Sequence, residues 1–511
     1  LAPVALALAL SGCMVGPDYV KAPVLTPEKF KELKGNPGKD WKLAAPRDSV
    51  DTGPWWALYR DPALDQLEEE VVLSNQNVAA AMEAYEQART LIREAQSALF
   101  PTVSTGYSTT RQYIGAALTN SGSSTASATP TTGSTSGSTT TTTTPGATGS
   151  RGRVTAIYTP QGTLTWTVDV WGQIRRQIES DIAGAQVSAA NLVNARLTAQ
   201  AALATAYFNR KAAVSLKEIL ERTAAEYQRT LEITRNQYKA GTVSAADVVS
   251  AETQLLATEA QAINTGVAIA QYEHAIALLV GKPPAAVSIP PTPLTGYVPS
   301  IPVAVPAALL ERRPDIAAAE RMMQEQNALI GVAVAAYYPN ITLSADLGFT
   351  GHVPLPLNPA HEFWSLTALA METVFEGGLR SAQVDAATST YRQSVANYRQ
   401  TVLTAFQQVE DQLAALRILA KQLKVQERAV AEARKAVTVY LNQYRAGIVA
   451  FTSVVVAEAN LLTTEQLALT TRQNLFLASV ALIEALGGGW DKSQLPGDFG
   501  VQTGPSIFPQ R

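Results

Sequence analysis

Two stretches of the chain have the polar and apolar pattern of unusually long helices. Residues 174–240 and 379–445 contain no proline and almost no glycine, and in the second stretch apolar residues recur first every 11 and then every 7 positions. At 1.5 Å per residue, each stretch predicts one helix of about 65 residues, or about 100 Å. The change of spacing predicts nearly straight packing first and left-handed coiling towards the following turn.

Alternation of apolar and polar residues predicts strands ahead of each long helix. It is clearest in residues 163–170 and 341–349, and weaker in residues 102–114 and 363–374, which we interpret as the partner strands of two hairpins. Each hairpin then has one apolar and one polar face. This pattern alone suits a soluble sandwich as well as a sheet in a membrane.

The chain contains an internal repeat of helix, strand, strand, long helix, turn and long helix. Phe100-Pro101 recurs as Tyr338-Pro339, and the Tyr-x-Ala-Gly sequence ending at Gly241 recurs at Gly447. The two Tyr-x-Ala-Gly copies are closer together in the sequence than Phe100-Pro101 and Tyr338-Pro339 are. The difference equals the length of a tract rich in Ser, Thr and Gly at residues 119–150. We interpret this tract as a solvated loop inserted in the first repeat.

The first residues resemble the end of a secretory signal. An apolar run at residues 1–10 is shorter than the roughly 20 residues that span a bilayer, and Leu10-Ser11-Gly12-Cys13 follows it as a lipobox. We predict that Cys13 carries a covalent lipid. An Asp after the lipidated cysteine usually retains a bacterial lipoprotein in the inner membrane, so Met14 at that position favours export to the outer membrane. The alternative is a lone buried cysteine. No later apolar run is long enough to predict a transmembrane helix.

Composition argues against several classes of function. Charged residues make up 16% of the chain and the net charge is −3, so no basic surface for nucleic acid is predicted. One cysteine and three scattered histidines give no metal cluster. Because the common catalytic motifs are also missing, we expect no enzyme, no catalytic or metal-binding residue and no cofactor except the lipid on Cys13.

Two hairpins supply only four strands, which cannot close a barrel or hide their edges in lipid. Several copies must therefore combine if the strands cross a membrane. A structural coiled-coil lipoprotein is the alternative, but it would need no lipid-facing hairpins.

The motifs, taken in order, resemble those of the TolC-like outer-membrane efflux proteins, and in particular the NodT-type lipoproteins of resistance-nodulation-division (RND) systems. The residues that carry the resemblance are Val15-Gly16-Pro17-Asp18-Tyr19 after Cys13, Trp55-Trp56, Asp61-Pro62-Ala63-Leu64, Phe100-Pro101, Glu311-Arg312-Arg313-Pro314-Asp315-Ile316, the two Tyr-x-Ala-Gly turns, and Ala485-Leu486-Gly487-Gly488-Gly489-Trp490.

This resemblance implies a mixed α/β membrane protein and a homotrimer. Its twelve-stranded outer-membrane β-barrel would continue as a twelve-helix periplasmic α-barrel with a mixed equatorial belt. The trimer would be a passive exit duct for small molecules, bound to a periplasmic membrane-fusion adaptor and powered by an inner-membrane RND transporter. Exit ducts for heavy metals or for type I protein secretion remain alternatives.

We divide the chain on this basis. The segments are a truncated signal peptide at 1–12, a lipidated N-terminus and equatorial segment at 13–73, the first repeat at 74–280, a proline-rich equatorial connector at 281–313, the second repeat at 314–486 and an equatorial tail at 487–511.

The resemblance also assigns roles to the two turns and to the helix after the second one. The predicted adaptor-contact tips are Tyr238, Gly241, Thr242, Asp247, Tyr444, Gly447 and Ile448; the glycines alone would also suit ordinary helix caps. Ile448, Thr452, Val456 and Ala459 are predicted to share one helical face. We predict a neutral aperture of Thr452, Ser453 and Val456 where many relatives carry acidic rings. The alternative is that this face packs against a neighbouring helix.

Overall fold

The computed structural model describes residues 14–27, 30–33, 54–114, 153–296, 298–299, 301, 312–490 and 495. The predicted signal, Cys13 and the 119–150 tract lie outside these residues. Two compact units divide the chain: the described residues of 1–15, 95–175 and 334–380 form the first, and the other described residues form the second. Each unit is therefore built from both sequence repeats.

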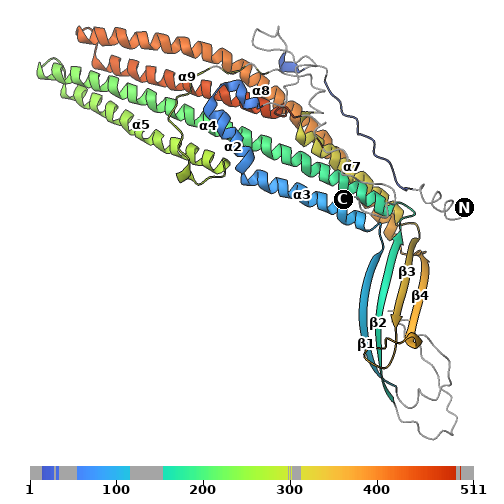
Figure 1. Cartoon of the computed structure of the whole chain (residues 1–511). Coiled ribbons are helices and arrows are strands. Elements are labelled where there is room, and N and C mark those ends of the chain that lie inside the picture. Colours follow the sequence, from blue (N-terminus) through green and yellow to red (C-terminus); the bar gives the residue numbers. More distant parts are fainter. Residues whose placement is uncertain are drawn as a thin grey trace, which may run out of the picture. The chain divides into compact units, whose positions relative to one another are not determined.

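The first unit contains one antiparallel sheet with the order β1-β2-β3-β4 (Figure 1). Its strands are β1 (Thr102–Ile114), β2 (Arg153–Val168), β3 (Asn340–Phe349) and β4 (Glu362–Met371). This confirms four strands, but two of them differ from the prediction in their bounds. Strand β2 begins ten residues before the predicted start and ends two residues before the predicted end, and β4 ends three residues before its predicted limit. The hairpin of each repeat joins the other through β2 and β3, so that Thr163 lies opposite Asp346.

The two faces of the sheet differ as the alternation predicts. On one face, the Asp346 carboxylate accepts hydrogen bonds from the hydroxyl groups of Thr163 at 2.8 Å and Ser365 at 2.9 Å, and thus ties three strands together. On the other face, Leu347, Trp364 and Leu366 are exposed. In the described residues of one chain, nothing covers these apolar side chains.

The repeated Phe-Pro and Tyr-Pro sequences mark where helices give way to strands. The Trp166 indole donates to the carbonyl of Leu99, next to Phe100, at 2.9 Å. In the second repeat, the Trp171 indole donates to the Pro339 carbonyl at 2.9 Å and stacks on Tyr338. These bonds satisfy the indole donors and hold the start of each hairpin.

The second unit is dominated by helices. They are α2 (Pro62–Ser74), α3 (Gln76–Ser97), α4 (Gln173–Lys239), α5 (Ala245–Leu279), α7 (Pro314–Ala335), α8 (Leu379–Arg445) and α9 (Phe451–Ala485), with short 3-10 turns at Lys31–Leu33, Trp55–Tyr59 and Pro284–Ala286. Both α4 and α8 contain 67 residues, and both α5 and α9 contain 35. The two predicted long helices are thus confirmed, and α4–α5 and α8–α9 form hairpins (Figure 1). Among the described helices, none is long and apolar enough to cross a membrane.

Two buried charged side chains lie next to each other on α4, among its apolar contacts. Arg210 is almost fully buried, and its guanidinium pairs with Glu273 of α5 at 2.9 Å and donates to the carbonyl oxygens of Ile289 and Pro290 in the connector. Next to it, Lys211 pairs with Asp61 at 2.9 Å. At this point along α4, charged contacts take the place of apolar ones. They connect α4 to the start of α2, to α5 and to the connector.

At the end of each repeat, a glycine allows the chain to lie in close contact with the segment where that repeat begins. Gly281 follows α5 with a φ of 70°, and a Cβ there would lie 2.1 Å from the carbonyl oxygen of Ser74. Gly487 follows α9 with a φ of 89°, and a Cβ there would lie 1.9 Å from the carbonyl oxygen of Arg312. Arg313 stabilises the contact at Gly487, because its guanidinium donates a hydrogen bond to the Ala485 carbonyl at 2.9 Å.

Candidate functional site

The two helical turns share one backbone geometry. Gly241 and Gly447 both have a φ of 74°. The N–H groups of Thr242 and Ile448, one residue later, donate to the carbonyls of Gln237 and Gln443 at 3.0 and 2.9 Å. This is the Schellman arrangement, in which a left-handed residue closes the helix. Since no described atom lies within 4 Å of a Cβ built on either glycine, the backbone conformation alone requires them.

The turns differ in how the next helix begins. Ser244 caps α5, and the Asp247 carboxylate accepts from the backbone N–H of Ser244 at 3.1 Å, which completes a capping box. Ala450 occupies the equivalent position before α9 and forms no side-chain cap. Asp247 therefore stabilises the first turn, and its half-buried side chain remains partly accessible to a partner.

Most of the predicted tip residues lie together. A hollow of about 540 Å³ between the two turns is lined by Gly241, Thr242, Asp247, Tyr444 and Gly447, among others. Tyr238 and Ile448 do not line it and are exposed.

Tyr444 differs from the other predicted tip residues in its burial. Tyr444 is buried: its ring packs 5.5 Å from that of Phe451 and its hydroxyl lies 3.4 Å from the Thr234 hydroxyl. Its side chain supports the turn from inside, whereas its counterpart Tyr238 is half exposed. The sequence motif is the same in both turns, but only the second tyrosine reaches the core between the hairpins.

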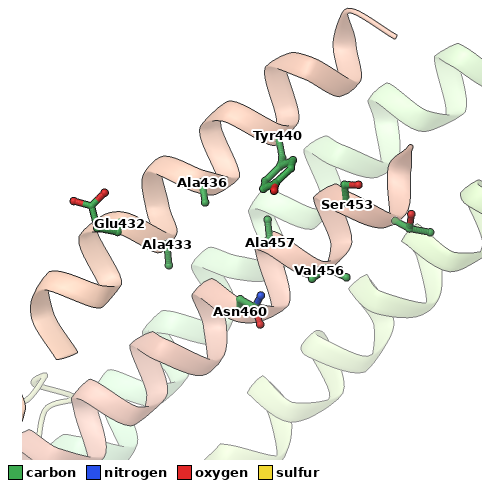
Figure 2. Close-up of a pocket in the computed structure, with 9 residues that line it drawn as sticks. Glu432, Ala433, Ala436, Tyr440, Ser453, Val456, Ala457 and Asn460 are labelled. Carbon is green, nitrogen blue, oxygen red and sulfur yellow. The ribbon is translucent and has the colours of Figure 1, made fainter. Parts of the chain in front are cut away.

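The predicted aperture residues lie on α9 beside a groove. Thr452, Ser453 and Val456 border a hollow of about 580 Å³ whose other side is formed by α8 residues such as Tyr440 (Figure 2). Thr452 and Val456 are exposed, whereas Phe451, Val454 and Glu458 form the buried face. Within one chain, the face of α9 that carries Thr452 and Val456 is therefore not packed against α4.

Ile448 does not belong to that helical face, contrary to the prediction. The helix begins at Phe451, so Ile448 lies in the preceding turn. The left-handed Gly447 redirects the chain there, and the spacing from Ile448 to Thr452 therefore has no helical meaning. Ala459, the last predicted member of the face, is half-buried.

Two buried carboxylates on α9 hold the hairpins together. Glu458 accepts a hydrogen bond from the Thr230 hydroxyl of α4 at 2.9 Å, and burial raises the pKa of Glu458 to about 7. Glu465, one heptad further, accepts from Arg222 of α4 at 2.6 Å and from Arg434 of α8 at 2.5 Å. Glu465 thus links three helices.

Glu465 is not among the site residues predicted from the sequence. Its signal is a carboxylate one heptad after Glu458, in a helix whose other buried positions are mainly apolar. Such a charge needs a partner, but the sequence does not say which arginine supplies it. No group of three or more potential metal-binding residues occurs within the described part of the chain.

The chain matches the family model described as outer membrane efflux protein over residues 67–282 and 305–488. These two stretches correspond to the two repeats, each with its sheet hairpin and its long helical hairpin. The chain belongs to the outer membrane efflux protein family.

Individual relatives agree with this assignment. The chain is 27% identical to the probable efflux pump outer membrane protein TtgC of Pseudomonas putida, over 95% of this chain and 94% of that protein. It is 25% identical to the cation efflux system protein CusC of Escherichia coli, over 96% of this chain and 99% of that protein. Among solved structures, the outer-membrane channel OprN has a TM-score of 0.80 at 26% identity, covering 94% of this chain and 100% of that one.

These findings confirm the predicted fold class, that of a chain of the trimeric TolC-like channels with four strands per chain. They also confirm its predicted place in the outer membrane and its role as an outer-membrane component of an efflux system.

Proposed function

We propose that three copies of this chain form the exit duct of a tripartite RND-type pump, which conducts small molecules passively without catalysing a reaction. The exposed apolar face of the sheet carries this proposal. Leu347, Trp364 and Leu366 are uncovered in one chain, and in the described sheet β1 and β4 each pair with a neighbour on one side only. Lipid chains can cover such an apolar face. Strand β1 of one copy can pair with β4 of the next, so that the backbone groups at both free edges form hydrogen bonds.

The tips supply the proposed contact with the periplasmic adaptor. Tyr238 and Ile448 are exposed apolar groups at the two turns, and Gly241, Thr242 and Asp247 border the hollow between them. A helical hairpin of an adaptor can bury the apolar groups and hydrogen bond to the polar ones. The inner-membrane RND transporter would act through this adaptor.

Thr452, Ser453 and Val456 are the proposed aperture. Their exposed face on α9 carries no charge of its own, since the first acid after the turn, Glu458, points into the hairpin core. A neutral ring obstructs ions by narrowness and dewetting and does not bind cations.

Cys13 is the proposed lipid anchor of the duct. The experiment is to replace Cys13 with Ser behind a cleavable signal and follow incorporation of labelled palmitate. Loss of the label with trimers retained supports the anchor. Labelling that persists in the Cys13→Ser variant excludes it.

Function is tested in cells and in bilayers. The gene, expressed with its adaptor and transporter in a strain that lacks outer-membrane efflux channels, should restore export of a fluorescent dye. The purified protein should have the mass of a trimer and form channels in planar bilayers. A monomeric protein without conductance would refute the duct.

A further inference from the structure

The loop that joins β3 to β4, residues 350–361, is uncharged and apolar. It contains three prolines and no Lys, Arg, Asp or Glu. Within it, Val353, Leu355 and Leu357 are between 54% and 69% exposed. The tract at 119–150, between β1 and β2 in the sequence, consists instead mainly of Ser, Thr and Gly. Three large apolar side chains close together on an exposed loop indicate a contact with something other than water.

Strand lengths give the level of this loop along the sheet. Strands β3 and β4 contain 10 residues each, and a tilted strand needs roughly 9–11 residues to cross a bilayer. Continuous pairing of β3 with β2 ends at Gly348 opposite Gln161, whereas β1 and β2 stay paired as far as Ile114 and Arg153 (Figure 1). In a sheet that crosses the membrane, the β3–β4 loop therefore lies where the hydrocarbon layer ends.

The middle of the β3–β4 loop lies on the apolar side of the sheet. Thr105, Gly162 and Leu347 form one row of paired residues, and Leu347 belongs to the exposed apolar face. Tyr107 follows Thr105 by two residues, so its side chain projects from the same face. The Tyr107 hydroxyl donates to the carbonyl of Pro354 at 2.7 Å. This bond holds the loop against the apolar face, away from the polar one.

Hydrogen bonds and prolines reduce the number of unpaired backbone groups in the loop. Gly351 and Tyr158 exchange two backbone hydrogen bonds, of 2.8 and 3.1 Å, and the Nδ1 atom of His352 donates to the Ala156 carbonyl at 2.9 Å. The three prolines have no N–H group to satisfy. Unpaired backbone groups are costly in hydrocarbon, so the backbone of the loop suits the boundary and only its apolar side chains suit the acyl layer.

Charged groups on both sides of the loop limit how deeply it inserts. Arg111, four residues beyond Tyr107 on the same face of β1, is exposed, and Glu362 directly after the loop is exposed as well. Charged side chains on the lipid face are costly near the centre of a bilayer but not near its surface. The apolar side chains of the loop therefore reach only the shallow part of the acyl layer.

We propose that the β3–β4 loop inserts Val353, Leu355 and Leu357 among the acyl chains of the outer leaflet, with Tyr107 holding it on the lipid side. The inference rests on the proposed duct, whose sheet crosses that membrane, and adds a lipid contact beyond the ends of β3 and β4. A second copy would meet the free edges of β1 and β4, whereas Tyr107 holds the loop over the face of the sheet. Lipid is therefore the occupant that fits this position.

Quenchers attached to lipid test the contact in the full-length protein, reconstituted in phosphatidylcholine vesicles. Leu355→Cys is labelled with bimane, and any label on the natural protein, which has Cys13 alone, is subtracted. A nitroxide near the lipid head group should quench this bimane more strongly than one near the end of the acyl chain, and aqueous iodide should quench it weakly. Two controls lie on β4: Leu366→Cys, on the apolar face, should respond to lipid nitroxides, and Thr367→Cys, exposed on the polar face, only to iodide.

The results separate the loop from the duct itself. If lipid quenches Leu366→Cys and only iodide quenches Leu355→Cys, the loop lies in water, which overturns the insertion and leaves the duct. Shielding of Leu355→Cys from both quenchers would show that protein covers the loop, and this also overturns the insertion. Absence of lipid quenching at both Leu355→Cys and Leu366→Cys would refute the proposed function as well.

Removal of one hydroxyl tests how the loop is held. In the Leu355→Cys background, Tyr107→Phe leaves the Pro354 carbonyl without its donor and should raise iodide quenching several-fold, because the loop moves towards water. The matched control is Tyr113→Phe, on the same face of β1, whose hydroxyl forms no hydrogen bond with the described residues and whose loss should change nothing. Equal iodide quenching in the two variants would overturn the role of Tyr107.

Discussion

The carboxyl group of Glu458 on α9 lies 2.9 Å from the hydroxyl of Thr230 on α4, and both side chains are buried. This contact lies one heptad nearer the tips than the Glu465 ion pairs, so the two hairpins are joined at two successive levels. A protonated carboxyl is favoured there because burial penalises its charged form.

We expect this contact to make the protein less stable as pH rises. The pKa of Glu458 is about 7 in the folded chain against 4.5 for an ordinary glutamate, so the unfolded chain loses its proton first. The stability contributed by this group is then fully present below pH 4.5, falls as pH rises and is lost completely only once pH has passed the folded pKa of about 7, with a change on the order of 3 kcal/mol per chain.

Thermal unfolding followed by circular dichroism between pH 5 and pH 8 checks this expectation. The Glu458→Gln variant keeps an acceptor for Thr230 but has no proton to lose, so its unfolding midpoint should fall less over this range than that of the natural protein. Equal pH dependence of the two proteins would assign the effect to other groups.

A charge at the proposed aperture should change ion flow. Val456→Asp introduces three carboxylates in the trimer, and we expect higher conductance and a shift towards cations in planar bilayers. The control is Leu467→Asp, three helical turns further along the same face of α9 and with similar exposure, 52% against 59%. Its effect should be clearly smaller. If Val456→Asp leaves both conductance and selectivity unchanged, Val456 does not line the aperture.

The Glu465 ion pairs should stabilise the helical hairpins moderately. Both arginines are at least half exposed, so each pair contributes about 1 kcal/mol or less, and Glu465→Gln should cost about 1–2 kcal/mol of unfolding free energy. The deficit should shrink in about 1 M salt, which screens such pairs. Glu221→Gln, which removes the exposed pair with Lys217 on α4, is the control and should have no measurable effect. A Glu465 deficit that is independent of salt would point to packing instead.

Sequence pattern was sufficient for the elements of this fold. The absence of proline from residues 174–240 and 379–445 predicted α4 and α8 within one residue, because little else ends a helix of that length. Alternation located β3 and the C-terminal part of β2, because the two faces of these segments meet different surroundings, but it missed the first ten residues of β2. The weaker strands β1 and β4 were also found, since a hairpin needs partners for its backbone groups.

Tertiary relationships were not accessible in this way. Tyr238 and Tyr444 occupy equivalent positions in one motif, yet only Tyr444 is buried, because the hairpins meet unequally at the tips. The partners of Arg210 and Glu465 come from helices distant in sequence. Helical spacing also extended one face back to Ile448, although the chain reverses before α9 begins.

The glycines at the helix junctions differ from those at the tips in what they exclude. At Gly241 and Gly447 a side chain meets only an unfavourable φ, which costs about 1–2 kcal/mol. At Gly487 the same φ problem is combined with direct overlap against a backbone oxygen. Backbone cannot move aside as a flexible side chain does, so the two kinds of position should respond differently to substitution.

We expect Gly487→Ala to be more damaging than Gly447→Ala or Gly266→Ala. The added Cβ would lie 1.9 Å from the Arg312 carbonyl oxygen, which forces α9 away from the start of α7 and weakens the bond from Arg313 to Ala485. Gly447→Ala should lower the unfolding midpoint modestly. Gly266→Ala, within α5 and without a described atom near its Cβ, should be neutral or stabilising by up to about 1 kcal/mol. Thermal unfolding and the trimer yield of the three variants measure this order, and a Gly487→Ala protein as stable as Gly447→Ala would show that the junction yields without cost.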